Sequence, residues 1–399
     1  MKKDRGTKNS NRMIKNRDFV VFSDDWGRHP SSCQHLFSHL AKLNRIIWVN
    51  TIGTRTPTLS IADFKRALSK IRGWLSSSSE QQIDSPVIVL NPVVIPFDAF
   101  RVVRRLNAWL LSRAVQGIIR ELELNSVILV TTIPNAAGVV GRVGESLSVY
   151  YCVDDFSEWP GADRQSMLEM ETDLLSRVNL VVATSERLFR DLSARHSQVD
   201  KLPHGVDWEH FQTTDNGEPP DPLSRLPHPR IGYVGLVDER LDCLIIEKLA
   251  RSLPDWSFVF VGPRQLPGGE LDRLSNVHFL DPVDYRDVPA TLAELDIAML
   301  PYLKNDLTER INPLKLRELL ATGMPIVATS LREIKRYAEY IELADSEQDW
   351  KTAILKLAGG TRNESTGQIE AMRSESWESR AYDFSDYLTS AADHQSGVT

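Results

Sequence analysis

Lys315 and Glu318 are the residues of this 399-residue chain whose types and spacing first suggest chemistry. They lie three positions apart in INPLKLRELLATGMPIVAT, residues 311–329, so a helix would place them on one side. A lysine ammonium can contact phosphate oxygens, and a glutamate carboxylate has two acceptor oxygens that can bind adjacent ribose hydroxyls. The alternative is an exposed ion pair on a helix surface, which stabilises a helix only slightly.

The same segment has the signals of a short helix. Asn312 can cap its start, Pro313 suits the first helical position, and Gly323 followed by Pro325 ends it. The preceding segment DIAMLP, residues 296–301, is predicted to be a strand, so the helix opens at the carboxyl edge of a sheet. A helix amino end presents unpaired N–H groups and a partial positive charge, which suits a diphosphate.

Two acidic residues end another predicted strand. In SVYYCVDDFSEWPG, residues 148–161, Asp154 and Asp155 stand where a loop should begin. Adjacent carboxylates at a sheet edge are costly unless they are used or solvated. The alternative is a helix cap beside a solvated turn residue.

A third candidate region is the loop SDDWGRHPSSCQHL, residues 23–36, between the first predicted strand and a helix. Gly27 permits close approach of the backbone to a ligand. Trp26 and Arg28 are candidate ligand contacts, although a packed tryptophan and a surface arginine are the commoner fates of such residues.

The elements that must position these residues alternate between strand and helix. Such alternation predicts right-handed crossovers and parallel sheets buried on both faces. A segment rich in Pro, Gly and Asp, residues 213–229, divides the pattern and predicts two domains, which the length also favours. The predicted strands lie at 18–23, 45–50, 86–90, 126–131, 148–153, 179–184, 230–235, 257–262, 276–280, 296–301 and 325–329.

Composition excludes several classes. Apolar residues make up 42% and charged residues 25%, which is typical of a globular protein. The net charge of −7 argues against nucleic acid as a partner. Three separated cysteines and the lack of metal-binding motifs predict no disulfide framework, no metal site and no cofactor, and a cytoplasmic location.

The predicted helix at residues 99–122 is rich in arginine and carries Trp109 among aliphatic residues. Basic amphipathic helices bind anionic membrane surfaces, so this helix is a candidate contact with the inner face of a membrane. The alternative is a domain helix that buries its aliphatic residues and solvates its arginines.

Four segments carry a family resemblance. NPLKLRELLATGMPIVAT resembles the donor-binding helix of GT-B glycosyltransferases of the family 4-like group, glycosyl transferases group 1, in which the closing Glu binds the nucleotide ribose. KLPHGVDWEHF resembles the turn that ends the family's amino-terminal domain, with His204 in place of the usual Asn. RIGYVGLVDERLD and SFVFVGP resemble the first two strands of its carboxyl-terminal domain. The matches keep the family's order over most of residues 18–390.

The resemblance implies an α/β, GT-B fold, in which two Rossmann-like doubly wound parallel-sheet domains face a cleft and a carboxyl-terminal helix packs back on the body. It also implies roles for the candidates. Asp154, with Asp155, would act near the anomeric carbon as a general base or by stabilising positive charge. The first loop and His204 would face the acceptor or the cleft. The implied donor-binding residues are Glu318, Lys315, Asn312, Arg310, Arg240, Gly235, Val283 and Tyr285.

Besides His204, the sequence departs from the family pattern at three further positions. Arg310 stands where the family often has a first Glu, eight residues before Glu318. Leu236 follows Gly235 where the family usually has basic residues for the diphosphate, and Asp154 stands where many relatives have His. Asp154 in place of His leaves open whether configuration is retained or inverted, and the missing first Glu leaves open how the donor sugar is bound and whether activity is kept.

The predicted function is transfer of a sugar from a UDP- or GDP-sugar to a hydroxyl of a glycan or lipid-linked saccharide, without metal, in cell-surface polysaccharide synthesis. The alternatives are a nucleotide-sugar epimerase of the same fold and an inactive GT-B binding module. The predicted parts are a basic arm (1–17), an acceptor domain (18–208), a linker (209–229), a nucleotide-sugar-binding domain (230–375), a helix (376–392) and a tail (393–399).

Overall fold

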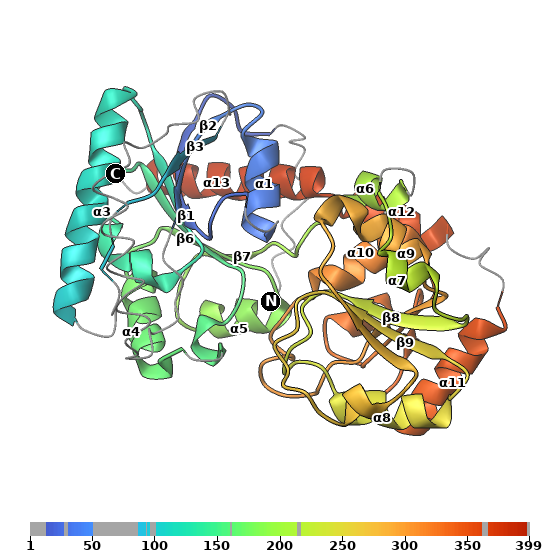
Figure 1. The fold of residues 1–399 in the computed structure, drawn as a ribbon. Helices are drawn as coiled ribbons and strands as arrows, with labels where there is room; N and C mark the ends of the chain where they lie inside the picture. The colour runs from blue at the N-terminus through green and yellow to red at the C-terminus, as the bar shows by residue number, and fades with distance from the viewer. Residues whose placement is uncertain are drawn as a thin grey trace, which may run out of the picture. The chain divides into compact units, whose positions relative to one another are not determined.

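The computed structural model describes residues 13–27, 31–50, 87–92, 94–95, 101–159, 162–213, 217–360 and 366–396 (Figure 1). The chain divides into two compact units. The first comprises Met1–Pro203 with Arg380–Thr399, and the second comprises His204–Ser379. Each unit has its own parallel sheet and its own hydrophobic core.

The first unit contains a seven-stranded parallel sheet in the order β3-β2-β1-β4-β5-β6-β7. The strand order reverses between β1 and β4, as in doubly wound folds. Its strands are β1 (Asp18–Ser23), β2 (Arg45–Asn50), β3 (Val87–Leu90), β4 (Ile128–Thr131), β5 (Leu147–Cys152), β6 (Leu180–Ala183) and β7 (Val199–Lys201). Its helices are α1 (Ser32–Leu40), α3 (Arg101–Glu121), α4 (Arg164–Leu175), α5 (Glu186–Ser193) and the 3-10 turns η1 (Pro134–Val139) and η2 (Phe156–Glu158).

The second unit contains a six-stranded parallel sheet in the order β10-β9-β8-β11-β12-β13. Its strands are β8 (Arg230–Val234), β9 (Ser257–Val261), β10 (Val277–Leu280), β11 (Ile297–Leu300), β12 (Ile326–Ala328) and β13 (Glu342–Leu343). Its helices are α6 (Trp208–Gln212), α7 (Asp221–Ser224), α8 (Cys243–Ser252), α9 (Val288–Ala293), α10 (Leu314–Thr322), α11 (Glu347–Ala358) and α12 (Thr366–Ser374). The 3-10 turns are η3 (Glu270–Arg273), η4 (Tyr285–Asp287) and η5 (Ile334–Tyr337).

The central strands of both sheets are buried along their whole length. Every residue of β1, β4, β5, β8, β9 and β11 is buried. Continuous runs of β-branched and aromatic residues form such strands because helices cover both faces of a parallel sheet. The predicted pair of Rossmann-like domains is therefore confirmed.

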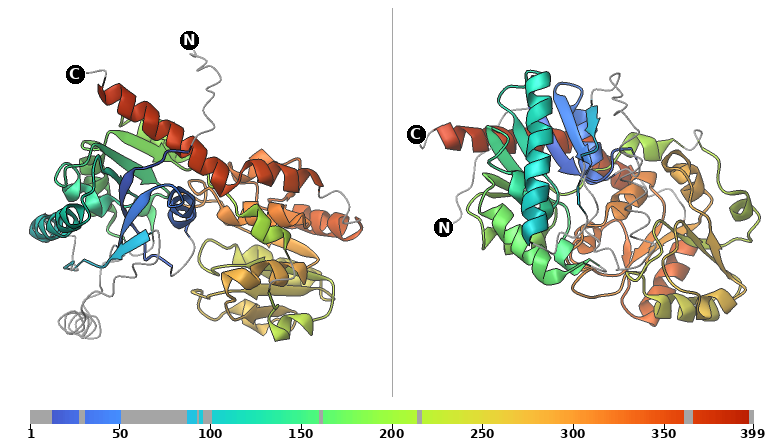
Figure 2. Two further views of the ribbon diagram at one scale, coloured as in Figure 1. Left: turned by 90° about the horizontal axis from the view of Figure 1, so that it is seen from above. Right: turned by 60° about the vertical axis from the view of Figure 1, so that its left-hand side comes forward.

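The last helix, α13 (Trp377–Ser396), belongs to the first unit from Arg380 onward and runs alongside that unit's strands (Figure 2). Phe384 is fully buried, with its ring centroid 6.1 Å from that of Phe37 and 5.9 Å from that of Tyr151. The Tyr387 hydroxyl donates to the carbonyl of Lys201 at 3.1 Å. These aromatic contacts anchor the carboxyl-terminal helix that the resemblance implies.

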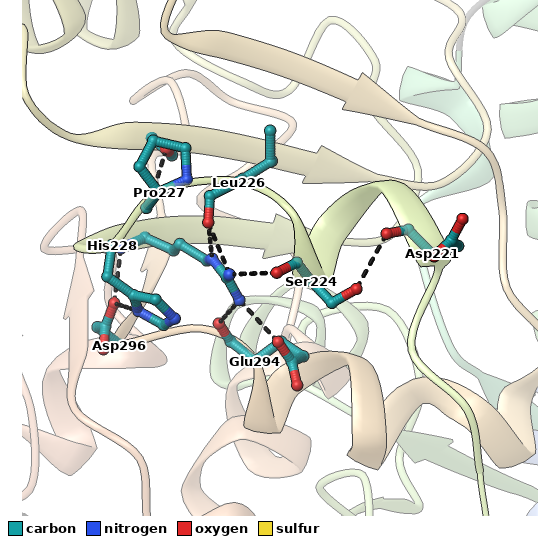
Figure 3. Close-up of polar contacts among 9 residues, drawn as sticks. Asp221, Ser224, Leu226, Pro227, His228, Glu294 and Asp296 are labelled. Carbon is teal, nitrogen blue, oxygen red and sulfur yellow. Dashed lines mark hydrogen bonds and ion pairs between the residues drawn. The ribbon is translucent and has the colours of Figure 1, made fainter.

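Residues 209–229, predicted to be a linker, lie in the second unit and include α7 and most of α6. Phe211 is 2% exposed and Leu223 is fully buried, because both join the second core despite the polar composition around them. Arg230 ties this segment to the start of β8. Its guanidinium donates to the carbonyls of Ser224 and Leu226 at 3.0 and 2.6 Å and to the Glu294 carboxylate at 2.7 Å (Figure 3).

Candidate functional site

The helix α10 opens toward the carboxyl edge of the second sheet, in the connection from β11 to β12. It begins at Leu314, with Pro313 at the cap position and no side-chain cap on its first N–H groups. The prediction that Asn312 caps this helix is wrong. Asn312 is buried and its Oδ1 accepts from Arg317 Nη1 at 2.6 Å, so its side chain is turned to another partner. Gly323 ends the helix, as predicted.

Lys315 lies against Gly235, the residue that follows β8. A Cβ at Gly235 would fall 2.7 Å from Lys315 Nζ and closer still to Cε, so a side chain there would displace the lysine. Gly235 has φ of +150°, which L-residues rarely adopt. Gly262, at the end of β9, is equally constrained, because a Cβ there would overlap the Gly235 carbonyl. The end of β8 thus places glycine backbone beside an ammonium group, and the end of β9 packs against that glycine.

Glu318 lies beside Lys315 and close to the loop after β10. Its carboxylate is 3.7 Å from Lys315 Nζ, and both side chains remain partly exposed. Burial, and after it the negative charges of Glu318 and Asp207, raise the pKa of Tyr285. Tyr285 is held by His210, whose ring stacks on it at 4.5 Å and whose Nε2 lies 2.9 Å from the Tyr285 carbonyl. Val283, in the same loop, is half-buried against the core.

The two arginines predicted to serve a diphosphate differ in their engagement. Arg240, in the loop after β8, is held by the Asp238 carboxylate, with Nη2 and Nε at 2.8 and 2.9 Å from its oxygens. Burial acts to lower the pKa of Arg240, but its hydrogen bond to Asp238 together with the nearby charges of Tyr302, Asp238 and Tyr233 raises the pKa overall. Arg310 is half-buried in the loop before α10. Among the predicted cations, Lys315 is the one placed against bare backbone.

The acidic pair of the first unit follows β5 directly. Asp154 is half-buried, and its two oxygens accept from the Asp155 N–H at 2.8 Å and from the Trp159 indole N–H at 2.9 Å. Asp155 caps the turn η2, since its Oδ1 accepts from the N–H and hydroxyl of Ser157 at 3.0 and 2.6 Å. The two neighbours therefore have different tasks, and the cap alternative applies to Asp155.

The first loop and His204 are less suited to ligand contact. Trp26 packs against Trp48, with ring centroids 4.7 Å apart. The Gly27 N–H donates to Gln34 Oε1 at 2.9 Å. Arg28 lies outside the described residues. His204 is 5% exposed and lies against Trp377, so its ring is in the interior of the second unit.

Sequence reasoning missed Trp159 and Gly262. Trp159 is 38% exposed, and its position five residues after Asp154 was the available signal. Gly262 follows a buried strand as Gly235 does, so the repeated strand-glycine pattern could have indicated it.

Comparison with known proteins gives the fold and a family match for part of the chain. Residues 228–359 match the family described as Glycosyl transferases group 1. The match lies within the second unit. The whole chain has the GT-B fold, because solved structures resemble it over both units. HepE of Anabaena, in complex with UDP and glucose, has a TM-score of 0.63 at 14% identity, covering 93% of this chain and 99% of that one.

Two further GT-B glycosyltransferase structures are similar. Sucrose-phosphate synthase of Thermosynechococcus elongatus has a TM-score of 0.64 at 14% identity, covering 94% of this chain and 99% of that one. The catalytic domain of starch synthase IV of Arabidopsis thaliana, bound to ADP and acarbose, has a TM-score of 0.62 at 11% identity, covering 95% and 100%. Identity at this level supports a common fold and no shared substrate.

A curated relative is a putative teichuronic acid biosynthesis glycosyltransferase, TuaH, of Bacillus subtilis strain 168. The two are 28% identical over 229 residues, which is 54% of this chain. The matched stretch covers 57% of TuaH.

Two surveys of the structure complete the description of the site. Within the described ranges, no three His, Cys, Asp or Glu side chains gather in a way that could hold a metal ion. In the same part of the chain, no helix has the length and apolar character needed to cross a membrane.

Proposed function

We propose that this chain is a glycosyltransferase that takes a sugar from a nucleoside diphosphate sugar to a hydroxyl of a glycan or lipid-linked saccharide in cell-surface polysaccharide synthesis. The observation that carries the proposal is Lys315 lying against the bare backbone of Gly235 at the uncapped start of α10. The group 1 match, the UDP and ADP in similar structures and the likeness to TuaH support it.

In the proposed reaction the acceptor oxygen forms a bond to the anomeric carbon while the bond from that carbon to the diphosphate oxygen breaks. The leaving diphosphate gains negative charge, which Lys315 and the N–H groups at the start of α10 stabilise. The Glu318 carboxylate accepts hydrogen bonds from the ribose hydroxyls. No metal or other cofactor enters this scheme, because a cation and a helix end supply the positive charge.

The acceptor proton needs a base, and we assign that task to Asp154 of the first unit. Its carboxylate is oriented by Trp159 and by the Asp155 N–H, which fixes it without neutralising it. Asp155 holds the loop.

Calorimetric titration of UDP and GDP into the metal-free protein tests the donor site. We expect one nucleotide to bind in EDTA, and Glu318→Ala to weaken it about tenfold, since a hydrogen-bonded charged group is lost. Glu339→Ala, an exposed glutamate of the same unit, is the control and should bind as the wild type does. A folded wild type that binds neither nucleotide would overturn the proposal and favour an interaction module.

Product analysis separates transfer from epimerisation. With donor and acceptor present, a transferase releases free nucleoside diphosphate in equal amount to glycosylated acceptor. An epimerase instead returns an altered nucleotide-sugar and needs no acceptor.

We further propose that α3 contacts an anionic membrane surface. Val102, Leu106 and Trp109 are 75%, 43% and 49% exposed along one face of this helix. Arg105 and Arg113 are exposed on the same face and form no ion pair with a described residue. Apolar side chains flanked by arginines suit the headgroup region of a negatively charged bilayer, where lipid-linked acceptors lie.

Sedimentation with vesicles tests this surface. We expect binding to vesicles containing phosphatidylglycerol and not to pure phosphatidylcholine, and loss of binding in Arg105→Ala/Arg113→Ala. Arg187→Ala/Arg190→Ala on α5 removes the same charge from the same unit and should leave binding unchanged. Equal loss in both variants would refute a specific role for α3.

A further inference from the structure

Arg317 is a buried charge on the inner side of α10. Its side chain is 1% exposed, whereas those of Lys315 and Glu318 are 25% and 21% exposed. The neighbouring Leu316 and Leu320 are also buried, so the position would suit an apolar residue. A guanidinium taken out of water is costly unless it is paired, and an apolar replacement of a buried pair often stabilises as well. Stability alone therefore does not explain an arginine at this position.

The partners of Arg317 lie at both ends of a short network. Its Nη1 donates to Asn312 Oδ1 at 2.6 Å, and its Nε to Glu375 Oε2 at 2.9 Å. The Tyr337 hydroxyl donates to the same Glu375 carboxylate at 2.8 Å. Asn312 lies just before the uncapped start of α10, so Arg317 holds the segment that leads the chain into this helix.

Glu375 links this network to two hydrogen-bonded segments, residues 205–206 and 375–377. The Val206 N–H donates to the Glu375 carbonyl at 3.1 Å, and the Trp377 N–H donates to the Val206 carbonyl at 3.2 Å. Gly205 packs so closely on Trp377 that a Cβ there would lie 2.9 Å from its Cα. These paired segments directly adjoin the two points, after Pro203 and after Ser379, at which the chain passes between the units.

We propose that Arg317 is a positioning residue for nucleotide binding. Through Asn312 and Glu375 it fixes α10 to the paired segments at residues 205–206 and 375–377, and so holds Lys315 and Glu318 in their binding arrangement. Directional hydrogen bonds set the rotation and the height of the helix, which a leucine contact would leave adjustable. This inference rests on the proposed function, since the helix must bind a nucleotide for its position to matter.

The test replaces the whole ion pair, because removal of one partner would leave an unpaired buried charge. Arg317→Met/Glu375→Gln is compared with Arg230→Met/Glu294→Gln, which removes another buried arginine pair of the same unit, at the start of β8. For each variant, thermal unfolding is followed and UDP and GDP are titrated by calorimetry. We expect the Arg317→Met/Glu375→Gln variant to bind nucleotide about tenfold more weakly than the wild type. The Arg230→Met/Glu294→Gln variant should change nucleotide affinity less than about twofold at a comparable loss of stability.

Tyr337→Phe is a second, milder variant. It removes one hydrogen bond from Glu375 and leaves the ion pair intact, so it should fold even if the double variant does not. We expect it to weaken nucleotide binding about threefold.

The outcomes distinguish the two proposals. If the wild type binds nucleotide and both Tyr337→Phe and Arg317→Met/Glu375→Gln bind it with the same affinity, the positioning role is overturned and the proposed function stands. Equal weakening by the Arg230 pair shows a general effect of stability and also overturns it. Absence of nucleotide binding by the wild type overturns the proposed function and this inference with it.

Discussion

The carboxyl edges of the two sheets differ in charge and in how their groups are held. The edge of the second sheet presents an ammonium, bare glycine backbone and an uncapped helix start. The edge of the first sheet presents carboxylates, each fixed by hydrogen bonds from its own loop. An anion suits the second edge, where an ammonium lies near a helix start that has no side-chain cap. Proton acceptance suits the first edge, where the Asp154 carboxylate is held in one orientation by two hydrogen bonds.

The largest expected effect is that of replacing Asp154 at the edge of the first sheet. We expect Asp154→Asn to lower the rate of sugar transfer by about 100-fold or more, which is the usual effect of losing a general base. Nucleotide affinity should stay within about twofold, because the donor groups are in the other unit. The measurements are steady-state transfer rates and calorimetry with the same nucleotide.

Asp155→Asn is the matched control at the adjacent position. It removes the cap charge of η2 and should lower the unfolding temperature slightly while the transfer rate falls only a few-fold. A larger rate loss in Asp155→Asn than in Asp154→Asn would reverse the assignment of the two acids.

At the edge of the second sheet, the largest expected loss of nucleotide binding follows substitution of Gly235. In Gly235→Ala the new methyl group overlaps the Lys315 side chain, and the backbone must keep a φ that alanine disfavours. We expect nucleotide binding to weaken by about 30-fold, since the lysine is displaced and the backbone is shielded. Gly269→Ala is the control, because a Cβ at Gly269 meets no atom within 4 Å. Equal affinity in both variants would argue against close approach of the phosphates to Gly235.

Lys315→Met keeps the length of the side chain and removes its charge. We expect nucleotide binding to weaken by about tenfold, because a hydrogen bond to a charged phosphate is lost. The loss should shrink at high salt, since a partly exposed charge is screened. Calorimetry at low and high ionic strength measures both effects. If Lys315→Met binds nucleotide as tightly as the wild type does, Lys315 is not the cation that binds the diphosphate.

The two edges also differ in how far the sequence predicts them. Strand-helix alternation and the ends of buried strands placed Gly235, Lys315 and Asp154 at sheet edges, because period and turn residues are local properties. Asn312 was wrongly predicted to cap α10, because its side-chain oxygen accepts a hydrogen bond from Arg317 instead. Residues 209–229 were wrongly predicted to be a linker, because Phe211 and Leu223 are buried in the core of the second unit. Both outcomes depend on long-range packing. The same holds for Arg240, whose engagement by Asp238 is visible only once the loop is folded.

The smallest expected effects on nucleotide affinity are those of substitutions in the Arg240–Asp238 pair. Since Asp238 already engages the guanidinium, Arg240→Met should change nucleotide affinity by less than about threefold. Asp238→Asn removes a negative charge from the loop after β8 and leaves Arg240 to a weaker neutral acceptor. We therefore expect Asp238→Asn to tighten nucleotide binding by about threefold, as titration at low ionic strength would show. Weaker binding in Asp238→Asn would mean that the carboxylate is needed to hold the loop in shape, and the second edge would then depend on a fixed acid as the first edge does.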